Sequence, residues 1–276
     1  MARIVGGCAV PHNPFLPKTV AENPEGIDAR QFPRVAAAIA EMEPDAVVAF
    51  SPDHLNTVFF DNLPSLLIGI VDEFSGPNDG YPPVAAKTLR SDPALARHIF
   101  LATLRADFDP ARSESLIVDH SLLVPLQIMG LDPVVVPIVM NVLAPPILSA
   151  ARAHAFGTAV GAAIRSYEPD LRVLVLSDGG VIQEVGGPRI RPGRPDGTPD
   201  QAWLAHVIEL LGAGEVERLV EESTPQRIAE VGNAAGELLT ALAMLGALGT
   251  SPAPELIEPE PEIGHMFGVW RAEEGG

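Results

Sequence analysis

The chain has almost no cysteine. Among its 276 residues the single thiol is Cys8, which lies within the apolar run that opens the sequence. One thiol cannot form a disulfide within the chain, and a cysteine-rich zinc site is excluded. The scarcity of cysteine leads us to expect a cytoplasmic protein. We expect Cys8 to behave as a small buried hydrophobic residue.

Basic and aromatic residues are also scarce. The chain carries 18 Lys and Arg against 36 Asp and Glu, a formal net charge of −18. A field of this sign repels phosphate backbones, so nucleic acid is excluded as a partner. Aromatic residues make up 5% of the chain but hydrophobic residues 47%. With a mean hydropathy of +0.21, these values predict a packed globule filled mainly by Val, Leu, Ile and Ala.

A long hydrophobic run is missing as well. The nearest candidate, residues 234–249, contains Glu237, and no other stretch approaches the length of a membrane span without a charge or a proline. The apolar start of the chain is too short for a signal peptide and ends at Pro11. We therefore expect no membrane segment.

What the sequence does contain is an alternation of strand and helix patterns. Short Val/Leu/Ile-rich runs at residues 3–10, 46–51, 65–71, 134–140 and 172–177 predict buried strands, the last of these being the last strong strand. Pro137 suggests that its run is an edge strand or carries a bulge. Helical spacing predicts helices at 28–42, 93–106, 146–168, 201–212, 215–222, 224–231 and 233–248.

This order is typical of one α/β domain. Continuous apolar strands separated by helices favour a mostly parallel central sheet with helices on both faces. The later part of the chain is predominantly helical. We find no internal repeat and no domain boundary, so residues 1–276 are expected to form a single domain.

Two histidines follow the first two predicted strands. His12 lies in C-A-V-P-H-N-P and His54 in F-S-P-D-H-L-N. Neighbouring parallel strands end side by side, so these imidazoles can converge at the sheet edge where α/β proteins bind ligands. Neutral imidazole is the commonest metal ligand. The alternative is that each is a loop histidine that caps a helix or a turn.

Two further motifs place polar groups next to helices. Asp119 and His120 precede a predicted helix in I-V-D-H-S-L-L, where Asp119 could cap the helix and His120 could face a pocket. Glu237 lies among Gly, Ala, Leu and Met in G-N-A-A-G-E-L-L, and burial there is costly unless the carboxylate is paired or binds a metal. Alternatively, Glu237 lies on an exposed face or in the first helical turn.

Two histidines and one carboxylate are the ligands of non-haem iron(II) oxygenases, which leave open positions for substrate and O₂. The same set could hold Zn(II) and activate water for a hydrolase or a lyase. The spacing of the three residues along this chain is not a local signature of either metal.

Taken in order, five motifs resemble the class III extradiol ring-cleaving dioxygenases. They are P-H-N-P, S-P-D-H-x-N, V-D-H followed by L-x-P-L, a strand followed by D-G-G, and a late helix with G-E-L, and they span residues 8–248. The resemblance implies that His12, His54 and Glu237 bind Fe(II). It implies that His120 helps to bind substrate or activated oxygen. The implied substrates are O₂ and a small dihydroxy or aminohydroxy aromatic, in a homo-oligomer that could include a small second subunit.

One departure from the family concerns proton transfer. Members of the family read G-G-x-S-H, and that histidine is their acid–base residue, whereas this chain reads D-G-G-V-I-Q-E, with Gln183 in its place. An amide cannot exchange a proton near neutral pH, and loss of such a group costs about 10²–10⁴ in rate. The role could pass to Glu184, Asp178, His120 or His265.

Two other outcomes remain open at this point. The substrate could need no such base, or the chain could be a non-catalytic member that pairs with an active homologue. For substrate binding, the candidates are His120, Asp178, His265 in I-G-H-M-F-G-V-W, and Arg189, which belongs to an arginine-containing loop and could attract a substrate carboxylate. A solvated loop is the alternative for Arg189.

Overall fold

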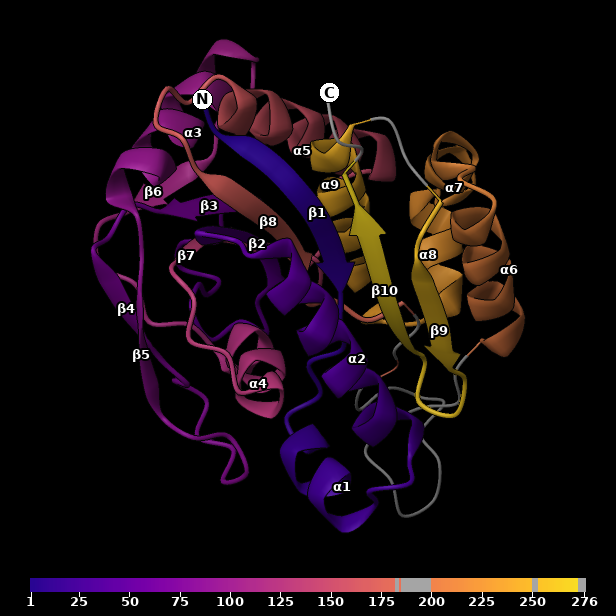
Figure 1. Cartoon of the computed structure of the whole chain (residues 1–276). Helices are drawn as coiled ribbons and strands as arrows, with labels where there is room; N and C mark the ends of the chain where they lie inside the picture. The colour runs from indigo at the N-terminus through magenta and orange to yellow at the C-terminus, as the bar shows by residue number, and fades with distance from the viewer. Residues whose placement is uncertain (182–183, 185–199, 250–252, 273–276) are drawn as a thin grey trace.

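An eight-stranded sheet forms the centre of the molecule in the computed structural model, which describes residues 1–181, 184, 200–249 and 253–272 (Figure 1). The strand order is β6-β3-β7-β2-β8-β1-β10-β9. The bounds are β1 Arg3–Ala9, β2 Ala46–Pro52, β3 Leu66–Gly69, β6 Ala111–Ser113, β7 Val135–Met140, β8 Arg172–Ser177, β9 Leu256–Glu260 and β10 His265–Arg271. A separate ribbon pairs β4, Glu73–Gly76, with β5, Lys87–Arg90.

The four central strands β7, β2, β8 and β1 are mutually parallel. Their apolar side chains are buried on both faces, as expected for strands covered by helices on both sides. The predicted α/β fold with a mostly parallel sheet is confirmed. The prediction that residues 172–177 form the last strong strand is wrong, because β10 pairs antiparallel with β1 and β9 pairs with β10. Only seven residues long, β10 follows a Pro- and Glu-rich stretch that hid its apolar pattern.

Pro137 does not mark an edge strand, which corrects a second expectation. Strand β7 lies between β2 and β3, with Pro137 opposite Ala49. The antiparallel register with β3 ends at Ile138, so Pro137 lies just beyond the paired residues on that side. A Cβ atom on Gly69 would lie 2.8 Å from the Pro137 ring. The absence of a side chain at Gly69 leaves room for the proline inside the sheet.

Helices cover both faces of this sheet (Figure 1). Helices α1 Leu16–Glu22, α2 Ile27–Met42 and α4 His120–Met129 contribute to one buried core. Helices α3 Pro93–Arg105, α5 Ala150–Arg165 and α9 Leu238–Leu248 contribute to the other, together with α6 Gln201–Gly212, α7 Val216–Glu222 and α8 Pro225–Val231. The short 3₁₀ helix η1, Ala235–Glu237, leads directly into α9. The prediction of a helical C-terminal part is correct up to residue 249.

Close packing against α5 determines where α9 lies. A Cβ atom on Gly157 would lie 1.8 Å from the carbonyl oxygen of Ala243, and one on Gly161 would lie 2.3 Å from that of Ala247. The two helix backbones therefore approach each other at positions that only glycine allows. Because α9 begins at the residue after Glu237, this packing also helps to place the Glu237 carboxylate.

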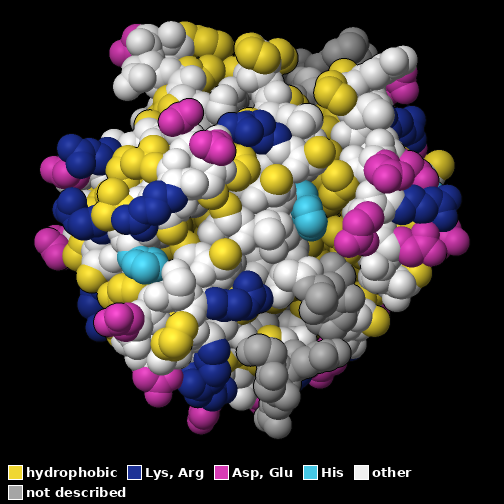
Figure 2. All heavy atoms as spheres, turned by 90° about the horizontal axis from the view of Figure 1, so that it is seen from above, with side chains coloured by type: hydrophobic (Ala, Val, Ile, Leu, Met, Phe, Trp, Pro, Cys, Tyr) yellow, Lys and Arg dark blue, Asp and Glu magenta, His cyan; other side chains and the backbone are white. Residues whose placement is uncertain are grey.

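Charged side chains of both signs share the surface. Figure 2 shows the face on which β1 begins, where Lys and Arg lie interspersed with Asp and Glu among apolar and neutral groups. Among the described residues, no helix combines the length and the apolar character needed to cross a membrane.

Candidate metal centre

The two histidines come from strands that are not adjacent, contrary to the expectation from the sequence. Strand β8 lies between β1 and β2, so His12 and His54 follow strands that flank a third. Asp178, the first residue after β8, contacts His12 after β1 and Ser51 in β2. Its carbonyl oxygen accepts a hydrogen bond from Nδ1 of His12, and its carboxyl group accepts one of 2.9 Å from the hydroxyl of Ser51 in β2.

Three donor atoms nevertheless converge at the carboxyl edge of the sheet. Nε2 of His12 lies 3.3 Å from Nε2 of His54, which lies 3.3 Å from Oε1 of Glu237. Nε2 of His12 lies 3.8 Å from the same Glu237 oxygen. Glu237 is fully buried, so the alternative that it lies on an exposed helix face is wrong.

The D-G-G motif supports Glu237 through its two glycines. Oε2 of Glu237 accepts a hydrogen bond of 2.7 Å from the backbone N–H of Gly180. A Cβ atom on Gly179 would lie 2.3 Å from the Thr240 hydroxyl and 2.4 Å from the Glu237 carbonyl oxygen. Glycine at both positions lets the turn after β8 lie directly against the start of α9, leaving Oε1 directed at the histidines.

Asp119 performs two structural tasks with one carboxylate. Its Oδ1 accepts from the backbone N–H of Ser121 and so caps α4, as the sequence suggested. Its Oδ2 accepts 2.9 Å hydrogen bonds from the backbone N–H and from Nδ1 of His54. With Nδ1 held in this way, the imidazole of His54 presents Nε2 to the other donors.

Electrostatics at this edge favour a cation between the carboxylates. Burial opposes charge on His54, but hydrogen bonds to Asp119 and Glu237 raise the pKa of His54 well above its usual value. Despite its burial, the pKa of Glu237 is lowered by His12 and His54. Burial lowers the pKa of His12 to about 4, which favours the neutral imidazole that metals bind.

A first-row metal ion fits this donor set. Ligand atoms about 2.1 Å from a metal lie about 3.0–3.4 Å apart, close to the separations among His12, His54 and Glu237. Two imidazole nitrogens and one carboxylate oxygen suit iron or zinc. His54 contacts the carboxylates of both Asp119 and Glu237, and a cation bound beside it would balance their charge.

His120 lies beside the three donors. Its ring stacks on His54 with the ring centroids 4.7 Å apart, and it lies 5.5 Å from the ring of His12. One nitrogen of each of the three histidines falls within a common span of 4.8 Å. Nδ1 of His120 donates to Oδ2 of Asp79, and both side chains are buried. Tyr81 lies edge-on to the His120 ring at 5.3 Å.

Asp79 was not expected from the sequence. It occupies the N-D-G triplet at 78–80, a pattern that predicts a turn, and Gly80 has the positive φ of 66° that such a turn requires. A buried carboxylate paired with a pocket histidine leaves no separate mark in one sequence. The nearness of Asp79 to His120 depends on the long excursion between β3 and α3, which periodicity does not define.

Two acidic candidates after β8 are buried. Burial raises the pKa of Asp178 well above its usual value, and the nearby charges of Asp119 and Glu237 raise it further, which favours the neutral acid. A carboxylate oxygen of Glu184 accepts a hydrogen bond of 3.1 Å from the backbone N–H of Asn233. Glu184 thus connects the segment after β8 to the segment before η1. Their roles in proton transfer and substrate binding stay predictions.

The remaining candidates are placed differently. His265 begins β10, is fully buried and has its Nδ1 3.5 Å from Oδ1 of Asp28 in α2. Neither of its ring nitrogens has a hydrogen-bond partner. Gln183 and Arg189 lie outside the described residues, so the predictions made for them stand as they were.

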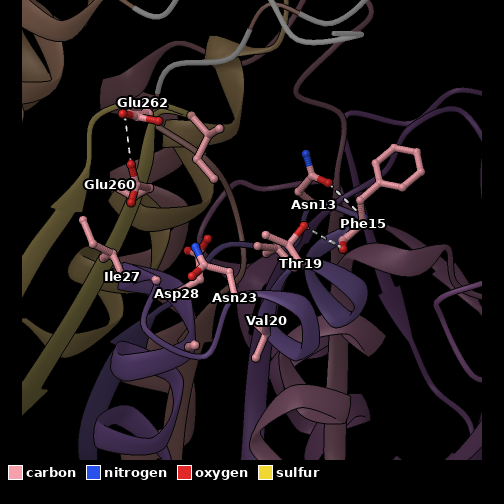
Figure 3. A pocket seen from close by; sticks show the side chains of 13 residues that line it. Asn13, Phe15, Thr19, Val20, Asn23, Ile27, Asp28, Glu260 and Glu262 are labelled. Atoms are coloured by element: carbon pink, nitrogen blue, oxygen red, sulfur yellow. Dashed lines mark hydrogen bonds between the residues drawn. The ribbon is translucent and has the colours of Figure 1, made fainter. Parts of the chain in front are cut away.

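A separate cavity of about 450 Å³, shown in Figure 3, is lined by none of the residues His12, His54, His120 and Glu237. Its walls come from the segment after β1, the start of α2 and the turn between β9 and β10. Asn13, the neighbour of His12 in the chain, lines one side, and Asp28 and Glu260 line another. The cavity was not expected, because it depends on the β9–β10 hairpin that the sequence did not predict.

The fold and the converging donors define an α/β protein with a candidate metal centre at the carboxyl edge of a parallel sheet. Over residues 6–271 the chain matches the family described as the catalytic LigB subunit of aromatic ring-opening dioxygenase, and it belongs to that family. This confirms the resemblance to class III extradiol dioxygenases. The chain is an enzyme, an oxygenase of the ring-opening type.

Several curated relatives share one name. A 2,3-dihydroxyphenylpropionate/2,3-dihydroxicinnamic acid 1,2-dioxygenase of Mycobacterium sp. (strain MCS) is 29% identical, with 91% of this chain and 95% of the relative covered. The protein of that name from Rhodococcus sp is 27% identical over 88% and 89% of the two chains. That from Mycobacterium ulcerans (strain Agy99) is 34% identical over 68% and 59%.

Proposed function

We propose that the chain is a non-haem Fe(II)-dependent extradiol dioxygenase that cleaves a small catechol-like aromatic, either a dihydroxy or an aminohydroxy compound. The observation that carries the proposal is the convergence of the His12, His54 and Glu237 donor atoms at 3.3–3.8 Å in a buried setting. The family, and relatives named as dioxygenases of dihydroxyphenyl compounds, support the reaction class.

In this proposal His12, His54 and Glu237 hold the iron. Bound there, iron supplies the redox chemistry with O₂ and the positions at which both oxygens of the aromatic diol attach. Hydrogen bonds to the other side-chain atoms of these ligands hold the three donor atoms in place. Asp178 receives Nδ1–H of His12, Asp119 receives Nδ1–H of His54, and Gly180 binds the second oxygen of Glu237. Such partners orient the ligands and limit their movement.

His120 is the proposed proton-transfer residue. Because Asp79 binds its Nδ1, Nε2 is left free to accept a proton from a substrate hydroxyl and to return it later. This assignment gives His120 the role of the family's acid–base histidine, which Gln183 replaces in this chain. An imidazole oriented by a carboxylate suits that task better than the neutral acid that burial favours at Asp178. Glu184 remains the second candidate base.

Oxygen consumption after anaerobic loading with Fe(II) tests the proposal. We expect uptake of O₂ with at least one member of a panel of catechols and aminophenols, together with incorporation of oxygen into a ring-opened product. The same chain loaded with Zn(II) is expected to consume none, which separates oxygen chemistry from a hydrolase. Absence of uptake across the panel by iron-loaded chain would overturn the proposal.

A further inference from the structure

The exposed aromatic side chains of this protein lie on loops that carry the candidate metal centre. Aromatic residues are scarce and most of them are buried, but four are exposed: Phe15, Phe59, Phe60 and Tyr81. Each of the four follows, by two to six positions in the chain, one of the site residues His12, His54 and Asp79. Exposed apolar side chains that gather at one place indicate a binding surface, whereas single ones do not.

Two of the four connect to the centre by direct ring contacts. The Tyr81 ring lies edge-on to the His120 ring with the centroids 5.3 Å apart, and the Phe15 ring lies edge-on to Tyr81 at 5.7 Å. His120 in turn stacks on the proposed ligand His54 at 4.7 Å. Tyr81 is 37% exposed and Phe15 44%. The rings therefore form a continuous surface that runs from a proposed metal ligand outward to solvent.

Hydrogen bonds hold the loop that carries Tyr81 in place. The side-chain amide of Asn78 donates at 2.9 Å to the carbonyl oxygen of Asn56, in the loop after β2. Asp79, two residues before Tyr81, accepts from Nδ1 of His120. The Tyr81 ring is thus positioned before any ligand binds. A surface that is fixed in advance loses little conformational entropy when a ligand packs on it.

The contact with His120 determines which part of a substrate meets Tyr81. In the proposed reaction a substrate hydroxyl lies within hydrogen-bond reach of Nε2 of His120, at about 2.6–3.2 Å. The aromatic ring that bears this hydroxyl then lies beside His120, with the proposed metal ligands on its inner side. A group attached to the outer side of the ring extends toward solvent along Tyr81 and Phe15. Apolar and aromatic groups pack favourably against the faces and edges of such rings.

We propose that Tyr81 determines substrate specificity by packing against an apolar substituent of the substrate ring, with Phe15 extending the same wall. The preferred substrate is then a catechol that carries an aryl or alkyl group. The inference rests on the proposed dioxygenase function and adds to it the class of substituent. The sequence did not indicate Tyr81, because its contact with His120 joins segments that are 39 positions apart in the chain.

A matched series of substrates tests the preference. Catechol is compared with catechols that carry a methyl or a phenyl group next to the diol, by O₂ uptake with iron-loaded chain. We expect KM to be about threefold to tenfold lower for the phenyl compound than for catechol, with the methyl compound between them. Tyr81→Ala is expected to abolish this difference, whereas Tyr81→Phe, which keeps the ring, retains it. Equal KM values in the native chain, or an unchanged preference in Tyr81→Ala, would overturn the inference.

Separate values of kcat and KM distinguish substrate binding from an effect on His120. A side chain that contacts the substrate equally in the ground state and the transition state changes KM and leaves kcat unchanged. We therefore expect kcat of Tyr81→Ala with the phenyl compound to stay within about twofold of the native value. A large fall in kcat with KM unchanged would mean that Tyr81 orients His120 instead, and would contradict the inference.

Phe60→Ala is the matched control. Phe60 is 68% exposed, and its ring pairs with that of Phe59 at 5.1 Å on the loop after β2. Its substitution removes an exposed aromatic side chain near the centre and is expected to leave the preference for the phenyl compound unchanged. An equal loss of preference in Phe60→Ala and Tyr81→Ala would contradict the assignment to Tyr81.

Binding without turnover separates failure of the inference from failure of the proposed function. Anaerobic calorimetry with Zn(II)-loaded chain measures the affinity for the same three catechols in the absence of any oxygen chemistry. Tighter binding of the phenyl compound by the native and Tyr81→Phe chains, but not by Tyr81→Ala, would support the inference even in a chain that consumes no O₂. Equal affinities for the three compounds, or no binding of any of them, would reject it.

Discussion

Oδ2 of Asp119 receives both the backbone N–H and the imidazole Nδ1 of His54, each at 2.9 Å. One oxygen atom thus fixes the position of the loop after β2 and the orientation of its histidine. The other oxygen of Asp119 caps α4 through Ser121. The positions of His54 and of the helix that begins with His120 are therefore coupled through a single side chain.

Asp119→Asn is expected to weaken metal binding without unfolding the chain. Asparagine caps helices about as well as aspartate, but its neutral amide holds the His54 imidazole less strongly. Loss of such a supporting carboxylate typically lowers metal affinity about 10- to 100-fold. Anaerobic titration with Fe(II) measures this change. Asp92→Asn is the matched control, since Asp92 caps α3 in the same way far from the centre. Equal affinities in both variants would contradict the role of Asp119.

Asp79→Asn is expected to lower turnover while iron content stays the same. Asp79 contacts His120 and none of the three proposed ligands, so the substitution leaves the metal in place, but the neutral amide holds Nδ1 of His120 less strongly than the carboxylate does. We expect kcat to fall about tenfold or more, with a smaller change in KM. Steady-state O₂ uptake and elemental analysis of the same preparation check both parts. The exposed Asp72 provides Asp72→Asn as control, and an equal loss in both variants would argue against the pairing.

Gly157→Ala is expected to destabilise the fold and displace α9. The new methyl group would lie 1.8 Å from the Ala243 carbonyl oxygen, and such overpacking costs about 1–3 kcal/mol in the free energy of unfolding. Gly212→Ala meets nothing within 4 Å and is expected to be neutral or to stabilise by up to about 1 kcal/mol. Urea denaturation compares the two. A Gly157→Ala chain as stable as the native one would show that the backbones of α5 and α9 leave room for a methyl group at Gly157.

Cys8 is expected to be unreactive in the folded chain. Burial raises the pKa of the Cys8 thiol to about 12, so below that pH the thiol stays neutral, and only the thiolate attacks. A disulfide reagent at pH 8 should label the native chain slowly and the urea-unfolded chain fully, as absorbance of the released thiol reports. Rapid labelling of native chain would mean that Cys8 is accessible.

Local patterns were sufficient to predict most of the parallel sheet. Continuous apolar runs such as those of β2 and β8 are buried on both faces and need no partner information to be recognised. The order of the strands across the sheet could not be predicted from these local patterns. Nothing in the sequence states that β8 lies between β1 and β2, or that β10 completes the sheet beside β1. Both depend on long-range pairing.

For the candidate site, polar residues at strand ends were informative and supporting residues were not. His12, His54 and Asp119 follow strands or precede a helix, where a polar side chain invites a functional interpretation. Glu237 stood out because it interrupts an apolar helix. Asp79 has the appearance of a turn residue, and Asp28 that of an ordinary helix start. Asp79 contacts His120 and Asp28 contacts His265. Neither contact can be predicted from the sequence, because each joins segments that are far apart in the chain.

Iron content of anaerobically loaded Glu237→Gln chain, beside that of the native chain, tests the central claim most directly. Glutamine keeps the shape of Glu237 but removes the charge that faces His12 and His54, and Glu217→Gln on the exposed side of α7 controls for the change itself. The account predicts near-stoichiometric iron and O₂ uptake with a catechol for the native chain and the control, and loss of both in Glu237→Gln. Full iron content and turnover in Glu237→Gln, or no iron in the native chain, would contradict it.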